Sequence, residues 1–203
     1  MAYLTRRLIA ATALVFATVG HGATPAAPAT AAAADADLAP AYTPDGKLKF
    51  PARYREGIFL SSGIDMSYSA SPSMAGHTMF DNVFVGPAPY REFMRTGTWP
   101  DRTMLVLEAR GGTSKGSINR KGTFQTGDVM AVEVHVKDTG RFGGGWAFFG
   151  FQGQDPAQQI PTSAECYSCH QKHGAVDTTM VQFYPTLLEV AKQKNTLSAT
   201  YEP

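Results

Sequence analysis

The middle of the chain alternates apolar and polar residues with the period of a β-strand. Over residues 129–137, three valines fall on one face of the expected strand, and Glu133 and His135 fall on the other. This pattern is typical of a half-buried antiparallel strand. Three more segments are short and rich in β-branched or aromatic residues, and they predict further strands at 78–85, 103–109 and 146–151.

Helices are predicted on either side of this strand-rich region. One begins at Pro89 and ends before Gly97, because proline suits a first helical position and glycine a C-terminal stop. Another spans residues 185–194 by the same logic. A third follows Thr162 and Glu165, whose spacing is that of a capping box. Strands in the middle and helices at the edges indicate an α+β domain built on an antiparallel sheet.

The N-terminal residues are not expected to join this domain. Residues 1–22 carry two arginines, then an apolar run, then small residues around Gly22, which is the pattern of a signal peptide cleaved near Gly22. The run is short for a membrane span, but a permanent N-terminal anchor remains an alternative. Residues 23–41 are almost entirely Ala, Pro, Thr and Asp and predict a disordered linker. We therefore expect an exported, periplasmic protein with one domain over residues 42–197.

The charge of the chain argues against one class of partner. The formal net charge is +1, and no cluster of lysines and arginines is present that would neutralise a phosphate backbone. No nucleic-acid partner is expected. The sequence after the signal peptide also lacks an amphipathic cationic helix that would bind a membrane surface.

The chemistry of the chain is concentrated in the motif Cys166-Tyr167-Ser168-Cys169-His170. Two cysteines at this spacing can each bond one vinyl-derived carbon of a haem, while the adjacent imidazole lies under the iron. We predict one covalently attached haem c on a helix near the C-terminus. Cys166 and Cys169 would attach it, and His170 would be the proximal iron ligand. Export favours this interpretation, because such haem attachment takes place outside the cytoplasm.

Two other interpretations of the motif stay open. The chain has only two cysteines, and in an exported protein they could form a disulfide, although the context of a thioredoxin-like redox motif is missing. A zinc ion could instead recruit both cysteines and His173. No second cysteine pair completes such a tetrahedral site.

A sixth iron ligand would decide whether the protein is mainly an electron carrier, and methionine or histidine is the usual choice. The candidates are Met66, Met74, Met79, Met94, Met104, Met130, Met180, His77, His135 and His173. Most methionines fill cores, His173 lies one helical turn from His170, and His135 is expected to face solvent or an interface. His77, in a glycine-rich loop before an expected strand, is the favoured candidate.

Short segments on both sides of the haem motif run in the order and spacing of a known family. They are Asp45-Gly46-Lys47-Leu48, Tyr54-Arg55-Glu56, Val83-Phe84-Val85, Tyr90-Arg91-Glu92-Phe93, Thr96-Gly97-Thr98-Trp99-Pro100-Asp101, the strand over 133–138, Arg141-Phe142, Trp146-Ala147-Phe148 and Phe183-Tyr184-Pro185. With the haem motif, they make residues 45–188 resemble the cytochrome P-460 family, which includes oxidases with a haem-lysine cross-link and the related cytochromes c′-β.

The resemblance implies an antiparallel sheet with a few packed helices, commonly a homodimer, and a five-coordinate iron that is open on its distal side. The oxidases of the family turn hydroxylamine, with nitric oxide, into nitrogen oxides and use a lysine bonded to the haem edge. The cytochromes c′-β lack this chemistry and bind nitric oxide or carbon monoxide in an apolar pocket capped by aromatic residues.

This chain departs from the oxidases at two positions that the resemblance marks as functional. Leu107 stands where the cross-linking lysine is expected, and leucine cannot form that bond. Asp81 stands where the family has a distal arginine, which reverses the charge. Lys115 and Lys121 are near in sequence, but they fall in a loop and are expected to be solvated. These departures argue against hydroxylamine oxidation.

The sequence therefore favours a periplasmic haem protein of the c′-β type that binds a small diatomic ligand such as nitric oxide. The expected distal pocket is apolar, and its candidate residues are Phe59, His77, Phe80, Asp81 and Leu107. Two alternatives remain: an oxidase of hydroxylamine or nitric oxide, and a six-coordinate electron-transfer cytochrome. A periplasmic redox partner is considered alongside the small ligand or nitrogen-oxide substrate.

Overall fold

The computed structural model describes residues 38–66, 78–114 and 121–201. The expectations that fall outside these residues concern the signal peptide, most of the linker, Met74, His77 and Lys115. None of the described helices is both long enough and apolar enough to cross a membrane.

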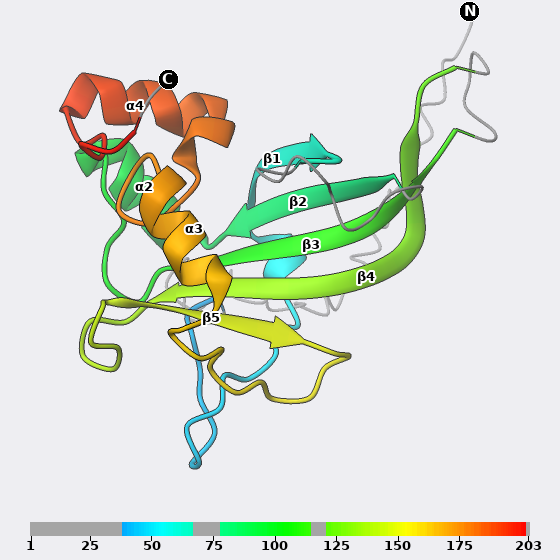
Figure 1. Ribbon diagram of the computed structural model, residues 1–203, viewed down its shortest axis with the longest axis horizontal. Coiled ribbons are helices and arrows are strands. Elements are labelled where there is room, and N and C mark those ends of the chain that lie inside the picture. Colours follow the sequence, from blue (N-terminus) through cyan, green and yellow to red (C-terminus); the bar gives the residue numbers. More distant parts are fainter. Residues whose placement is uncertain (1–37, 67–77, 115–120, 202–203) are drawn as a thin grey trace, which may run out of the picture.

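One antiparallel sheet dominates the described part of the chain. Its strands are β1 (Ile58–Ile64), β2 (Met79–Val85), β3 (Met104–Thr113), β4 (Phe124–Lys137) and β5 (Trp146–Phe151). They pair in the order β1-β2-β3-β4-β5, so each strand lies beside its neighbour in sequence. Figure 1 shows the far ends of β3 and β4 curving away from the helices as a long two-stranded arm.

Three α-helices accompany the sheet within the described residues: α2 (Pro87–Thr96), α3 (Glu165–His173) and α4 (Pro185–Lys194). Single 3-10 turns, η1 (Tyr54–Glu56) and η2 (Val181–Phe183), precede β1 and α4. Gly97 ends α2 in the left-handed conformation at φ 77°, and Asn195 ends α4 at φ 55°. The helices gather beside one end of the sheet (Figure 1).

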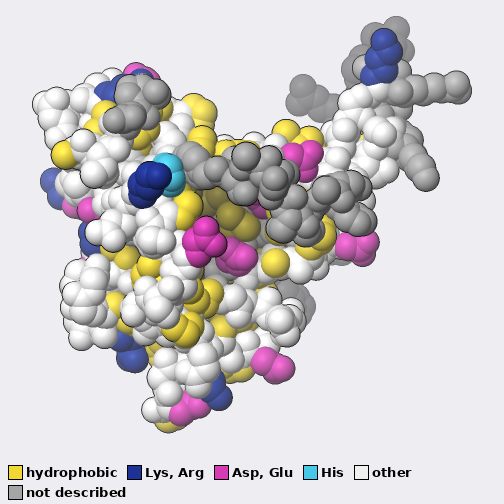
Figure 2. Space-filling model, viewed as in Figure 1, with side chains coloured by type: hydrophobic (Ala, Val, Ile, Leu, Met, Phe, Trp, Pro, Cys, Tyr) yellow, Lys and Arg dark blue, Asp and Glu magenta, His cyan; other side chains and the backbone are white. Residues whose placement is uncertain are grey.

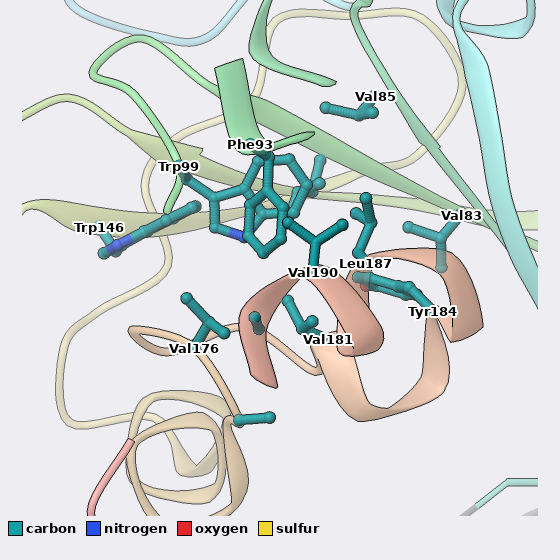
Figure 3. Packing of buried hydrophobic residues seen from close by; sticks show 13 residues of the cluster. Val83, Val85, Phe93, Trp99, Trp146, Val176, Val181, Tyr184, Leu187 and Val190 are labelled. Atoms are coloured by element: carbon teal, nitrogen blue, oxygen red, sulfur yellow. The ribbon is translucent and has the colours of Figure 1, made fainter. Parts of the chain in front are cut away.

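A different layer packs on each face of the sheet. On one face, α2, α4 and the segment after α3 pack on the strands, and the rings of Phe93 and Trp99 lie 4.3 Å apart between them (Figure 3). On the other face, the valines of β4 pack with Leu48 and Tyr54 of the N-terminal segment. The valines of β4 thus belong to the second core, whereas on the other face of the strand His135 is buried and Glu133 is exposed.

The expected α+β class with an antiparallel sheet is confirmed, and all four predicted strands are present. Three details differ. β1 was not predicted, because Ser61-Ser62-Gly63 interrupts its apolar pattern. The strand is held by pairing with β2, and a bulge lies between Phe59 and Ser61. The predicted capping box at Thr162 is absent, because α3 starts after Ala164 and no side chain caps it. The folded part also begins before residue 42, because Leu38 is buried.

Candidate functional site

A cavity of about 540 Å³ lies between the helix-facing side of the sheet and the segment that follows α3. Its wall includes Leu105 and Leu107 of β3, Glu133 and His135 of β4, and His170 of α3. Figure 2 shows hydrophobic side chains in a hollow with acidic side chains beside it. The volume is within the range of about 300–1,000 Å³ that is usual for cofactor and ligand pockets.

The His170 ring is held by the chain that follows α3. Its Nδ1 lies 2.8 Å from the carbonyl oxygen of Thr178. Because a carbonyl oxygen can only accept, Nδ1 carries the proton and donates it, and Nε2 keeps a free lone pair. Burial lowers the pKa of His170, with the Thr178 hydrogen bond opposing that effect. The imidazole is therefore neutral near pH 7 and has the tautomer that an axial iron ligand needs.

The loop from Gly174 to Thr179 is held in place by hydrogen bonds from the segment that follows α2 and from β4 of the sheet. Trp99 Nε1 donates to Thr179 Oγ1 at 2.9 Å, and Lys137 Nζ contacts Asp177 Oδ2 at 3.0 Å. A Cβ atom at Gly174 would lie 2.7 Å from the His170 carbonyl oxygen and 2.9 Å from the Thr178 carbonyl carbon. Only glycine allows this close approach of the loop to the end of α3.

Cys166 and Cys169 are both partly buried on α3, and neither is in a disulfide. Burial raises the pKa of the Cys166 thiol, and the charge of Glu133 in the cavity wall adds to this effect. Two free thiols one turn apart, beside a cavity that His170 lines, fit the attachment of a c-type haem. The zinc alternative finds no support, because no group of three or more His, Cys, Asp or Glu among the described residues could hold a metal ion.

His135 lies on the cavity side of β4 and does not face solvent, which was one of the two environments expected for it. Its side chain is buried, stacked on the Phe148 ring at 3.9 Å and 9°, and close to Trp146 at 4.4 Å. The ring centroids of His135 and His170 are 5.1 Å apart, in an edge-on arrangement. Burial, and to a lesser degree the His170 charge, lower the pKa of His135 well below its usual value.

The candidate distal residues separate into two groups. Leu107 and Asp81 both line the cavity. Phe80 and Phe59 are not part of its wall. Side chains alternate along β2, so Phe80 points away from the face that carries Asp81 and Val83. Phe59 is 54% exposed and packs against Phe84 on the opposite face of the sheet.

The cavity wall is only partly apolar, which corrects the expectation of an apolar pocket. The carboxyl groups of Asp65, Asp81 and Glu133 share the wall with Val83 and Leu107. Burial raises the pKa of Asp81, and the charges of Glu133 and Asp65 raise it further. Asp81 therefore retains a proton to higher pH than an exposed aspartate does.

Few of the candidate sixth ligands reach the cavity. Of the methionines in the described residues, Met66 and Met180 line it. The Met180 sulfur accepts a hydrogen bond from Gln182 Nε2 at 3.4 Å. None of the described lysines lines the cavity, and Lys121 is exposed.

Sequence reasoning missed Glu133 and Thr178 as site residues, and it considered His135 only as a sixth iron ligand. The alternation along β4 had placed Glu133 and His135 on one face, but it could not show that this face meets α3. For Thr178 the contributing atom is a backbone carbonyl, which no residue pattern reveals.

A family model described as cytochrome P460 matches residues 51–181, which is more than half of the 203 residues and includes the Cys166 to His170 motif and the cavity wall from Asp81 to Thr179. A search of the curated proteins found no match. The chain belongs to the cytochrome P460 family and is a monohaem c-type cytochrome of that family.

Proposed function

We propose that the protein binds a small diatomic ligand such as nitric oxide at a five-coordinate haem c, as cytochromes c′-β do. In this proposal, Cys166 and Cys169 hold the haem covalently and His170 is its proximal ligand. When bound, the haem would supply an iron able to take a small ligand. The observation that carries the proposal is that Leu107, at the position where the resemblance expects the cross-linking lysine, lines the cavity, and that none of the described lysines does.

The chain's own residues account for the open position. The ring centroids of His135 and His170 are only 5.1 Å apart, in an edge-on arrangement, which supports placing both rings on the same side of the haem. His135 therefore belongs to the His170 side and is not the sixth ligand. Val83 and Leu107 give the cavity apolar surface that admits a small uncharged molecule. The carboxyl groups of Asp81 and Glu133 disfavour anions such as nitrite or cyanide in the same space.

The same carboxyl groups favour a second candidate function. Oxidation of hydroxylamine releases protons, and the Glu133 side chain lies in the cavity wall, where it would accept them. An oxidase without a cross-link would use this carboxylate. Oxidation is the second candidate because the oxidases of the family use a haem-lysine cross-link, and Leu107 cannot form it.

Two measurements separate these functions. The reduced protein is titrated with nitric oxide and with carbon monoxide, and hydroxylamine turnover is measured with an artificial electron acceptor. The proposal predicts binding of both gases and no sustained turnover. Turnover that Glu133→Gln abolishes would establish the oxidase instead. Failure to bind either gas would indicate a strong sixth ligand, and His77, Met66 and Met180 would be substituted in turn.

Export and assembly complete the proposal. We expect cleavage near Gly22 and a periplasmic protein, because haem c is attached outside the cytoplasm, and the resemblance implies a homodimer. The N-terminal sequence of the mature protein and sedimentation equilibrium of the haem-loaded protein test these points. An intact N-terminus retained in the membrane fraction would establish the anchor alternative.

A further inference from the structure

His135 is buried among aromatic rings. Its ring is stacked on Phe148, lies against Trp146, and is 6% exposed. Burying an imidazole costs more free energy than burying an apolar ring of similar size, because its polar nitrogens leave water. A histidine here therefore calls for a polar partner.

Thr178 supplies that partner and also contacts His170. The Thr178 hydroxyl lies 3.4 Å from His135 Nε2, and the Thr178 carbonyl oxygen lies 2.8 Å from His170 Nδ1. One residue thus bridges the two imidazoles. The edge-on contact of the rings, at 78° between their planes, is a second link between them.

We propose that His135 is a positioning residue for the iron ligand: with Thr178 it fixes the ring plane of His170 and keeps the hydrogen bond at His170 Nδ1 short. The inference rests on the proposed ligation of iron by His170. Rotation of an imidazole about its terminal torsion is broad and weakly restricted. The edge contact from His135 and the anchored Thr178 carbonyl restrict it.

This arrangement has an electronic consequence. A strong hydrogen bond from Nδ1 to a carbonyl makes Nε2 more basic, and a more basic axial ligand stabilises ferric over ferrous iron. His135 therefore lowers the reduction potential through His170, without touching the haem's open side. A residue that only filled space would leave the potential unchanged when replaced by phenylalanine.

The test uses haem-loaded protein and three variants. His135→Phe keeps the stack on Phe148 but loses the Thr178 contact, and Thr178→Val loses the hydroxyl but keeps the carbonyl. His173→Gln is the matched control, because it removes an imidazole from α3, the helix that carries His170, at a position outside the cavity wall. Reduction potential is measured by spectroelectrochemistry, and the iron–histidine stretch of the ferrous protein by resonance Raman.

We expect His135→Phe and Thr178→Val each to raise the potential and lower the stretching frequency, while His173→Gln changes neither. The double variant should shift both quantities no further than one single variant does, because both act through one contact. Unchanged values in Thr178→Val and His135→Phe, or fully additive shifts, would overturn the proposal. The variant Thr178→Val keeps the test valid even if His135→Phe does not fold. A separate variant tests whether His170 binds the iron at all: if it does not, His170→Gly leaves the absorption spectrum unaltered.

Discussion

Leu107 and Glu133 face each other as direct partners on β3 and β4, and both side chains line the same cavity. An apolar residue at the position expected for the cross-linking lysine therefore lies beside a carboxylate. Asp81, on β2, adds a second carboxyl group to this wall. The pocket combines apolar surface with negative charge, which suits a small uncharged ligand better than an anion.

The Asp81 carboxyl makes folding stability depend on pH. Its pKa is raised by burial and by the neighbouring Glu133 and Asp65. A raised folded-state pKa gives stability that is complete below the unfolded pKa and is lost as the pH rises through the folded pKa. We expect Asp81→Asn to raise Tm at pH 7 and to change it much less at pH 4. Asp155→Asn, at an exposed position, is the control. An equal effect of Asp81→Asn at both pH values would contradict the account.

The Glu108 network on the opposite face should be a main source of stability. The buried carboxylate of Glu108 accepts hydrogen bonds from Tyr54, Arg55 and Arg110. Burial alone would raise its pKa, but the hydrogen bonds from Arg110, Tyr54 and Arg55 outweigh this effect and lower it. We expect Glu108→Gln to destabilise the fold by about 2–3 kcal/mol, because it leaves buried donors poorly paired.

The pH dependence of this contribution has the opposite sign to that of Asp81. A lowered folded-state pKa gives stability that is present above the unfolded pKa and is lost as the pH falls through the folded pKa. Urea unfolding of the wild type and of Glu108→Gln should therefore converge on acidification. Tyr54→Phe, which removes one hydroxyl, should cost only about 1 kcal/mol. A larger loss for Tyr54→Phe than for Glu108→Gln would be inconsistent with a network centred on Glu108.

Gly174 should be needed for the position of the loop that holds His170. A Cβ atom there would meet backbone atoms of His170, Thr178 and Thr179 at 2.7–2.9 Å, and backbone cannot move aside as a side chain can. We expect Gly174→Ala to lower Tm and to raise the reduction potential, because the Nδ1 hydrogen bond lengthens. Gly144→Ala, with no atom within 4 Å of the added Cβ, should leave both unchanged. Unaltered Tm and potential in Gly174→Ala would show that the loop is not so constrained.

The strand period was readable from the sequence, whereas the environment of each face was not. The alternation along β4 correctly placed Glu133 and His135 together, but it could not show that this face lines a cavity in which His135 is buried. β1 escaped prediction because pairing with β2 holds Ser61-Ser62-Gly63 extended against their low strand propensity. Phe80 and Asp81 were both candidate distal residues, but adjacent strand residues point to opposite faces, and only Asp81 lines the cavity. The haem motif needed no tertiary information, because its chemistry lies in five consecutive residues.

Covalent haem attachment should depend on both cysteines. Protein made with the haem-attachment machinery should keep its haem through denaturing electrophoresis with a peroxidase stain, and Cys166→Ala with Cys169→Ala should lose it. Ser168→Ala, between the two cysteines and exposed, should retain the stain. His170→Gly should also retain it but alter the iron's spectrum, because the thioether bonds are separate from axial ligation. A stain unchanged in the double cysteine variant would rule out thioether attachment.

The most direct test of an uncross-linked, five-coordinate haem is the absorption spectrum of the reduced protein before and after carbon monoxide is added. Leu107 cannot bond to the ring, so we predict the bands of an ordinary high-spin c-type haem and a clear shift on binding the gas. A band displaced far to the red would reveal a lysine cross-link. A low-spin spectrum that carbon monoxide does not change would reveal a sixth ligand, and either result would contradict the proposed function.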